Sequence, residues 1–333
     1  MSLENKILEL KANFALRAPD PKQDHPWHLV HLHADFMELK CMLWEKNSLL
    51  TVQDVITHYR DYDVDVGIKK SSLLSEQVTN PASEINDEWQ SKMIDIFEVL
   101  EERLCLYEDD YPFIIGHNHI QLKANLTSRH KLYLSLLLAS NLNNFSKVQN
   151  VITAEFETFS KYLLEDFFPK INVEEFGQNS SFKGNTVDKI EALSKILKIK
   201  TRPDYLNQIP KNANKEKGLD VVGWQQFNDE IANMLILLAQ CACGKNWVDK
   251  ISETKSYDTF LDFVRINPLH LMFIPYGLAH YDNNFYQAEK TNGLLFFERK
   301  RFLDISDEKL EQLVELDTFK IVDDLLRSDF FEV

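Results

Sequence analysis

The sequence predicts an α+β or α/β protein in two parts, with a helical domain at residues 1–170 and a domain built on a small mixed sheet at residues 171–333. Apolar residues at helical spacing dominate the first half. The second half alternates helical segments with apolar runs of strand length. Glycine is sparse, with 9 residues in 333, which argues against a fold with many tight turns between strands and helices.

The first half contains four segments that predict amphipathic helices. They cover residues 31–50, 88–108, 130–142 and 148–168. A polar, glycine-containing stretch follows at residues 168–184 and is the predicted domain boundary.

The second half reads as helix, strand, strand, helix, strand, helix. The helix at 185–200 carries an apolar stripe, and an irregular basic connector leads to apolar strands at 219–224 and 231–242. Helical residues around 248–265 precede a predicted strand at 294–305. Ser306 then opens the last helix, since serine followed by acidic residues is typical of a helix N-terminus.

The two apolar strands predict a hairpin that brings two polar residues together. With the turn centred near Asp229 and Glu230, paired residue numbers sum to about 460, so that Asp220 faces Gln240 at roughly 5 Å. A carboxylate and an amide oxygen at that distance can share Mg²⁺ or Mn²⁺. Lys245, just beyond the second strand, could hold a phosphate or orient water. The plain alternative is that Asp220 begins a strand and Gln240 ends one.

A helix with acidic residues, a strand with Asp and a strand with Gln and a nearby lysine together resemble the PD-(D/E)XK restriction-endonuclease-like nucleases. The resemblance covers roughly residues 180–305. It implies Asp220 and Gln240 as metal ligands, and Asp188 or Glu191 as the supporting acidic residue on the helix. Two positions depart from the family pattern. Leu219 precedes Asp220, and Ala242 stands where the lysine is expected, so Lys245 or Lys250 would have to supply the amine.

The resemblance implies a Mg²⁺- or Mn²⁺-dependent endonuclease that hydrolyses phosphodiester bonds of DNA, as the effector of a bacterial defence or restriction system. The net charge of −15 makes the chain a poor solitary DNA binder, so a partner such as a helicase or another NTPase is expected. A homo-oligomer is compatible with the sequence. The rival hypothesis is a catalytically degenerate nuclease-fold scaffold within a multiprotein complex.

Charge is distributed unevenly along the chain. Residues 51–115 hold 15 acidic and 5 basic residues, whereas residues 182–219 hold 9 basic and 4 acidic. A second basic group, Arg299, Lys300 and Arg301, falls on the predicted late strand. These side chains could contact a nucleic-acid backbone or could protect an exposed sheet edge from aggregation.

Four further features of the sequence bear on localisation and metal binding. No apolar run reaches the roughly 18 residues of a membrane span, and the N-terminus lacks signal-peptide features. The four cysteines are expected to be reduced thiols, so a cytoplasmic protein is predicted. The histidines of HPWHLVHLH could bind zinc, but packing within a helix is the favoured interpretation.

Overall fold

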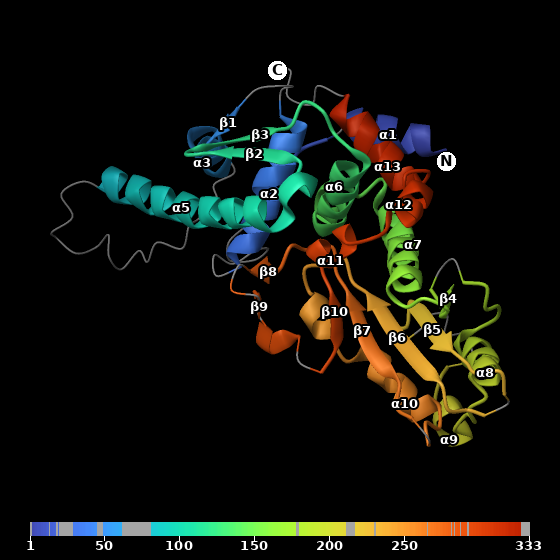
Figure 1. The fold of residues 1–333 in the computed structure, drawn as a ribbon. Coiled ribbons are helices and arrows are strands. Elements are labelled where there is room, and N and C mark those ends of the chain that lie inside the picture. The colour runs from blue at the N-terminus through green and yellow to red at the C-terminus, as the bar shows by residue number, and fades with distance from the viewer. Residues whose placement is uncertain are drawn as a thin grey trace. The chain divides into compact units, whose positions relative to one another are not determined.

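The computed structural model (Figure 1) forms two units, each with its own internal contacts. Unit 1 comprises Met1–Gln149, Tyr276–Tyr286 and Phe319–Val333, and unit 2 comprises Asn150–Pro275 and Gln287–Thr318. The structure describes residues 2–12, 14–17, 19, 29–44, 49–61, 81–177, 180–210, 217–229, 231–264, 266–280, 282, 284–286, 288–291 and 293–327.

The division of the chain differs from the predicted ranges of 1–170 and 171–333. Unit 2 begins at Asn150, so it includes the helix at residues 149–167 that the sequence places in the first domain. Two later segments also return to unit 1. Local hydrophobic periodicity does not report which neighbours a helix packs against, so this boundary is a property of the tertiary structure.

Unit 1 is mainly helical, as the sequence predicts, but it also contains strands. Its main helices are α1 (Leu3–Ala12), α2 (Val30–Leu43), α3 (Val52–Asp61), α5 (Pro81–Tyr107), α6 (Ser128–Ser140) and α13 (Asp317–Leu326). A small antiparallel sheet has the order β1-β3-β2, from Leu50–Thr51, His119–Leu122 and Phe113–Gly116. A separate pair is formed by β8 (Ala279–His280) and β9 (Asn284–Phe285).

Unit 2 contains the mixed sheet that the sequence predicts for the second half. Its five strands have the order β10-β7-β6-β5-β4, from Leu295–Phe297, Leu269–Phe273, Leu235–Cys241, Val221–Gln225 and Asn172–Glu175. β4, β5 and β6 are antiparallel neighbours, whereas β6, β7 and β10 are parallel. The helices are α7 (Gln149–Phe167), α8 (Thr186–Leu197), α9 (Pro203–Leu206), α10 (Tyr257–Phe260), α11 (Arg299–Leu303) and α12 (Asp307–Leu313).

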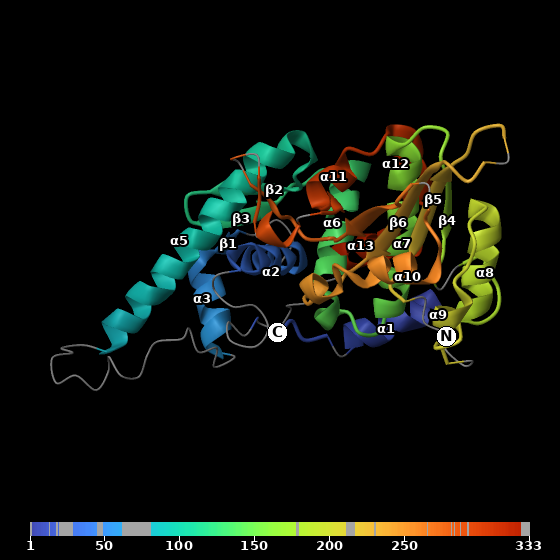
Figure 2. The same cartoon turned by 90° about the horizontal axis from the view of Figure 1, so that it is seen from below.

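The two faces of the unit 2 sheet have different neighbours. On one face, Val222, Ile236 and Leu238 form a buried core with α8, α9 and α10, and Figures 1 and 2 both show α8 beside β4 and β5. Alternate strand residues point to opposite faces. Leu238 points into that core, so Cys241, three residues later on β6, points to the opposite face. There it interacts with Ser160 of α7.

The predicted strand at residues 294–305 is wrong over most of its length. β10 ends at Phe297, and residues 299–303 form α11. Glu298 begins this helix, since its side chain accepts a hydrogen bond from the main-chain nitrogen of Arg301, an N-cap contact that competes with extension of the strand. Within the described parts of the chain, no helix is long and apolar enough to cross a membrane.

Candidate active site at the ends of β5 and β6

The hairpin of β5 and β6 has the register that the sequence predicts. Val221 pairs with Ala239 and Trp224 pairs with Ile236, and both pairs sum to 460. The register follows from the position of the polar turn between the two apolar runs, since β6 is buried on both faces and burial alone does not select one pairing. The end of the hairpin therefore brings Asp220 close to β6.

Asp220 lies one residue before β5, where the ladder of main-chain hydrogen bonds ends. Its main-chain nitrogen donates to the oxygen of Ala239 at 2.9 Å. Its carboxylate oxygen Oδ2 accepts from the main-chain nitrogen of Cys241 at 2.7 Å. The half-buried carboxylate thus takes the place of a main-chain acceptor and ties the end of β6 to the start of β5.

Gln240 is 3% exposed, and its side chain takes a different partner from Asp220. Its Nε2 donates to Oε2 of Glu253 at 2.6 Å. No described residue gives the buried Oε1 a hydrogen-bond partner. Gly218 makes room for this pair, since it has a φ of +79° and a Cβ there would lie 2.3 Å from Cβ of Glu253. The buried Gln240 is therefore paired with Glu253, which is an exposed residue.

Two thiols lie beside the carboxylate of Asp220. Burial raises the pKa of Cys241 well above its ordinary value, with further increases from the charges of Asp220 and Glu157. Burial likewise raises the pKa of Cys243, again assisted by Asp220 and Glu157. Both thiols are therefore protonated at neutral pH, and both lie within the electrostatic reach of the same two carboxylates.

Glu157, on α7, is the acidic residue that the sequence-based hypothesis missed. A Cβ on Gly177 would lie 2.3 Å from its Oε2, so the carboxylate packs against the bare α-carbon of that glycine. The nitrogen of Gly177 donates to the main-chain oxygen of Asp220 at 3.2 Å, which places Glu157 next to the start of β5. The available signal was an acidic residue on the helix immediately before the first strand of the sheet.

The acidic residues predicted on the helix at 185–200 serve other roles. Asp188 lies in the first turn of α8, and its Oδ2 accepts from the nitrogen of Asn185 at 2.9 Å. Asn185 in turn accepts from the nitrogens of residues 187 and 188, so the two side chains form a reciprocal cap. Glu191 is exposed. The structure does not bring either side chain into contact with Asp220.

The two candidate lysines differ in their surroundings. Lys245 is exposed, whereas Lys250 is half-buried. The positive charge of Lys250 lowers the pKa of Cys243, opposing the effects of burial and of the two carboxylates. Lys250 is therefore the amine that shares the surroundings of Cys243 with Asp220 and Glu157.

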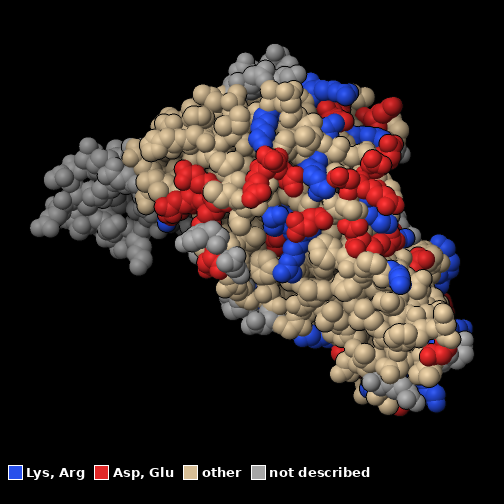
Figure 3. All heavy atoms as spheres, viewed as in Figure 1, with Lys and Arg blue, Asp and Glu red and all other residues tan. Residues whose placement is uncertain are grey.

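The basic residues of α11 make contacts within unit 2. Arg299 is fully buried, and its Nε donates to the oxygen of Pro275 at 2.9 Å. Lys300 forms an ion pair of 3.0 Å with Asp304, and Arg301 donates to the main-chain oxygen of Phe296. Arg299 thus lies where a nucleic-acid backbone cannot reach it. On the face seen in Figure 3, charged side chains of both signs are interspersed.

Unit 1 contains a second cluster of buried charges, formed by α2 and α5. Arg103 makes ion pairs of 2.7 Å with Asp35 and 2.8 Å with Glu38. Tyr111 and Tyr133 donate to Glu38 at 2.7 and 2.9 Å. The buried arginine thus has two anionic partners, and the carboxylate of Glu38 has several hydrogen-bond donors. A buried charge needs such partners to be stable in the folded protein, so the cluster has a structural role.

Two of the four histidines of HPWHLVHLH, His25 and His28, lie outside the described residues. His31 and His33 are buried in α2. Nδ1 of His33 lies 3.1 Å from the hydroxyl of Tyr59, and His31 stacks on Tyr286. These contacts agree with helix packing, the favoured interpretation of the motif.

The side chains around Asp220 decide whether it can bind a metal ion. Across the described residues, no group of three or more His, Cys, Asp or Glu side chains is placed to hold one. Asp220 and Glu157 supply two hard carboxylate donors, and Mg²⁺ commonly uses only one or two carboxylates with water and phosphate oxygens. The donors therefore fit a largely hydrated Mg²⁺ or Mn²⁺, whereas the predicted pair of Asp220 and Gln240 has its side chains bound to different partners.

Comparison of the chain with family models, with curated proteins and with solved structures gives no match.

Proposed function

We propose that unit 2 is a restriction-endonuclease-like domain that hydrolyses phosphodiester bonds of nucleic acid, with DNA as the expected substrate. The observation that carries the proposal is the order and register of its elements. A helix with Glu157 precedes the sheet, Asp220 directly precedes the antiparallel strand β5, and the paired strand β6 ends beside it. This order agrees with the pattern of acidic helix, aspartate strand and following strand in the PD-(D/E)XK nucleases.

The proposal assigns the chemistry to a revised set of residues. Asp220 and Glu157 would hold the metal, which when bound would activate water and neutralise charge on the scissile phosphate. Lys250 would face the phosphate, because it is the lysine whose charge acts on Cys243 beside the two carboxylates. Gln240, through its bond with Glu253, would keep the end of β6 in place.

Cleavage by matched variants tests this assignment. Plasmid, single-stranded DNA and single-stranded RNA are incubated with Mg²⁺ or Mn²⁺ and either the wild type or Asp220→Asn, Glu157→Gln or Lys250→Met. Glu191→Gln is the control, since it removes an exposed carboxylate that does not contact Asp220. The proposal expects metal-dependent cleavage that the first three changes reduce at least a hundredfold and the control leaves unchanged. Cleavage that persists in Asp220→Asn would refute it.

A second candidate function is a non-catalytic scaffold or interaction subunit. It is favoured by two uncharged thiols near Asp220, Cys241 at the end of β6 and Cys243 two residues beyond it, because protonated thiols are poor ligands for Mg²⁺. It is also favoured by exposed apolar side chains at the other end of the sheet, where Ile231, Val264 and Leu269 are 55%, 78% and 40% exposed. Large exposed apolar patches are typical of interaction sites, and these three side chains are the candidates for one at this end of the sheet.

The two candidates differ in their response to metal alone. A nuclease site should be stabilised by Mg²⁺ or Mn²⁺ in the wild type, with a higher Tm, and Asp220→Asn should abolish this shift. A scaffold predicts the same Tm with and without metal and no cleavage of any of the three substrates.

A further inference from the structure

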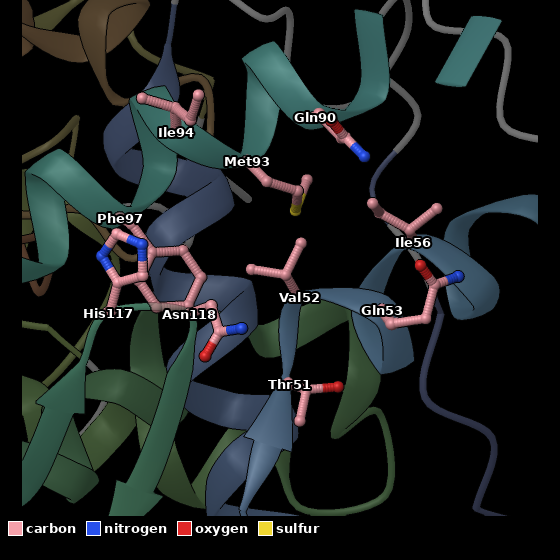
Figure 4. Close-up of a pocket in the computed structure, with 10 residues that line it drawn as sticks. All are labelled: Thr51, Val52, Gln53, Ile56, Gln90, Met93, Ile94, Phe97, His117 and Asn118. Carbon is pink, nitrogen blue, oxygen red and sulfur yellow. The ribbon is translucent and has the colours of Figure 1, made fainter. Parts of the chain in front are cut away.

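Unit 1 has a hollow on its surface between α3, α5 and the turn that joins β2 to β3, here called the α5 hollow. Its volume is about 580 Å³, and of the described residues that line it His117 is the only one with a titratable side chain. Figure 4 shows Met93 and Val52 projecting into it from the two helices. Met93 is 1% exposed, whereas Ile94, in the same lining, is 60% exposed. Ile94 is therefore the apolar side chain that a partner can reach.

Acidic residues accompany Ile94 on the outward face of α5. Glu98 and Glu101 are exposed and follow Ile94 at intervals of four and three residues, which places all three on one side of the helix. Among the described side chains of α5, residues 89–107, the basic ones are Lys92, which is half-buried, and Arg103, which is buried. The α5 hollow is therefore bordered by negative charge.

Unit 2 has an exposed apolar surface with the opposite charge. Val264 and Ile266 are 78% and 40% exposed. Together with Lys198, Lys200 and Ala232 they line a hollow of about 280 Å³. These five residues are here called the basic patch.

The acidic residues described around the basic patch have partners of their own. Asp262 forms an ion pair of 2.9 Å with Arg202. Oδ1 of Asp229 accepts from the main-chain nitrogen of Ile231 at 3.0 Å. Lys200 is exposed, so the basic patch presents positive charge to a partner beside its apolar side chains.

The α5 hollow and the basic patch are complementary, since each combines exposed apolar surface with charge and the charges are opposite. We propose that the basic patch of one copy binds the α5 hollow of a second copy, so that the chain associates with itself through two different surfaces. Contacts between two basic patches or two α5 hollows would bring like charges together, which disfavours them. The contact is heterologous, so each copy can bind a neighbour through each surface. This proposal does not depend on cleavage by unit 2.

Sedimentation equilibrium of the full chain in low-salt buffer tests the proposal, between roughly 1 and 200 μM, a range that detects micromolar association. The mass should rise with concentration from the 39.0 kDa of one chain to that of a dimer or more. Salt screens exposed charges, so about 0.5 M NaCl should weaken the association about threefold or more. Val264→Asp and Ile94→Asp should each weaken it about tenfold or more, because each places a charge in the apolar contact.

An equimolar mixture of these two variants is the decisive sample. Val264→Asp keeps an intact α5 hollow and Ile94→Asp keeps an intact basic patch, so the mixture should form dimers and nothing larger. Leu8→Asp is the matched control, since it adds the same charge at a side chain of α1 that is 63% exposed, and it should associate like the wild type. Asp220→Asn should also do so, which separates this contact from the proposed nuclease site.

Far-UV circular dichroism confirms that each variant is folded. Three results would each overturn the proposal. They are a wild type that stays monomeric at every concentration, wild-type association of both Val264→Asp and Ile94→Asp, and a mixture of the two that stays monomeric.

Discussion

Oδ2 of Asp220 accepts a 2.7 Å hydrogen bond from the main-chain nitrogen of Cys241, one step beyond the last pair of the β5–β6 ladder. The residue with the strongest functional expectation in the sequence therefore also has a structural role. Any loss of activity on changing Asp220 has to be separated from a loss of stability, and the side chain offers a way to do so.

Asp220→Ala should lower the free energy of unfolding by roughly 1–3 kcal/mol, because the nitrogen of Cys241 loses its acceptor. Asp220→Asn should lower the free energy of unfolding by less, since the amide oxygen can still accept the hydrogen bond. Urea denaturation of the two variants measures the difference. Glu191→Ala is the exposed control, with an expected effect within about 0.5 kcal/mol. Equal stability of the wild type and Asp220→Ala would mean that the bond contributes nothing to folding.

Arg103→Ala should destabilise the protein by about 3–5 kcal/mol, because it leaves the buried carboxylates of Asp35 and Glu38 without their cation. Arg103→Lys should recover only part of this loss, since an ammonium cannot reproduce the two-pronged geometry of the guanidinium. The measurement is the urea midpoint of unfolding, followed by tryptophan fluorescence, to which Trp44 and Trp89 contribute from unit 1 and Trp224 and Trp247 from unit 2.

The matched control for this network is Arg327→Ala, which removes an exposed arginine from the same unit. Its expected effect is within about 0.5 kcal/mol. If Arg103→Ala and Arg327→Ala proved equally mild, the network would not hold unit 1 together.

His130 should make the start of α6 sensitive to acid. Its Nδ1 accepts from the nitrogen of Thr127 at 3.0 Å, and its Nε2 lies 2.7 Å from the oxygen of Asp109. This pair of contacts requires the neutral ring with the proton on Nε2. Burial lowers the pKa of His130 below its ordinary value of 6.5.

The sign of the effect follows from that direction. The unfolded chain takes up the proton as the pH falls through 6.5, before the folded chain does, so stability should be full above pH 7 and should decrease as the pH falls below 6.5. His130→Gln keeps an acceptor at this position of the cap and should flatten the pH dependence. Urea midpoints between pH 5 and 8 measure it, and an unchanged slope in the variant would contradict the assignment.

Alkylation should distinguish the four cysteines. Cys105 is exposed, Cys241 is half-buried, and Cys41 and Cys243 are buried. Burial raises the pKa of Cys41, Cys241 and Cys243, and the thiolate is the reactive form. Iodoacetamide at pH 8 should therefore modify Cys105 in the folded protein and the other three only after denaturation, as read by peptide mass spectrometry. Rapid native labelling of Cys41 or Cys243, which are buried, would show that their surroundings open.

Much of unit 2 could be predicted from local sequence. The apolar runs of β5 and β6 predict the hairpin, and the polar residues between them predict its register, because a turn centred near residues 229 and 230 makes paired residue numbers sum to about 460. The helix at residues 185–200 is likewise predicted from its apolar stripe. The predicted strand at residues 294–305 was wrong where α11 forms. The apolar residues of this run suit a strand as well as a helix, and the pattern does not show that Glu298 caps a helix there.

The candidate site shows the same division between local pattern and tertiary structure. The sequence by itself determined that Asp220 and Gln240 stand at the same end of one hairpin, because register depends on residues close along the chain. Only the tertiary structure decided that Glu157 lies beside Asp220 and that Gln240 bonds to Glu253. These contacts depend on which face of the sheet α7 and the loop after β6 cover, and that choice depends on packing across the whole of unit 2.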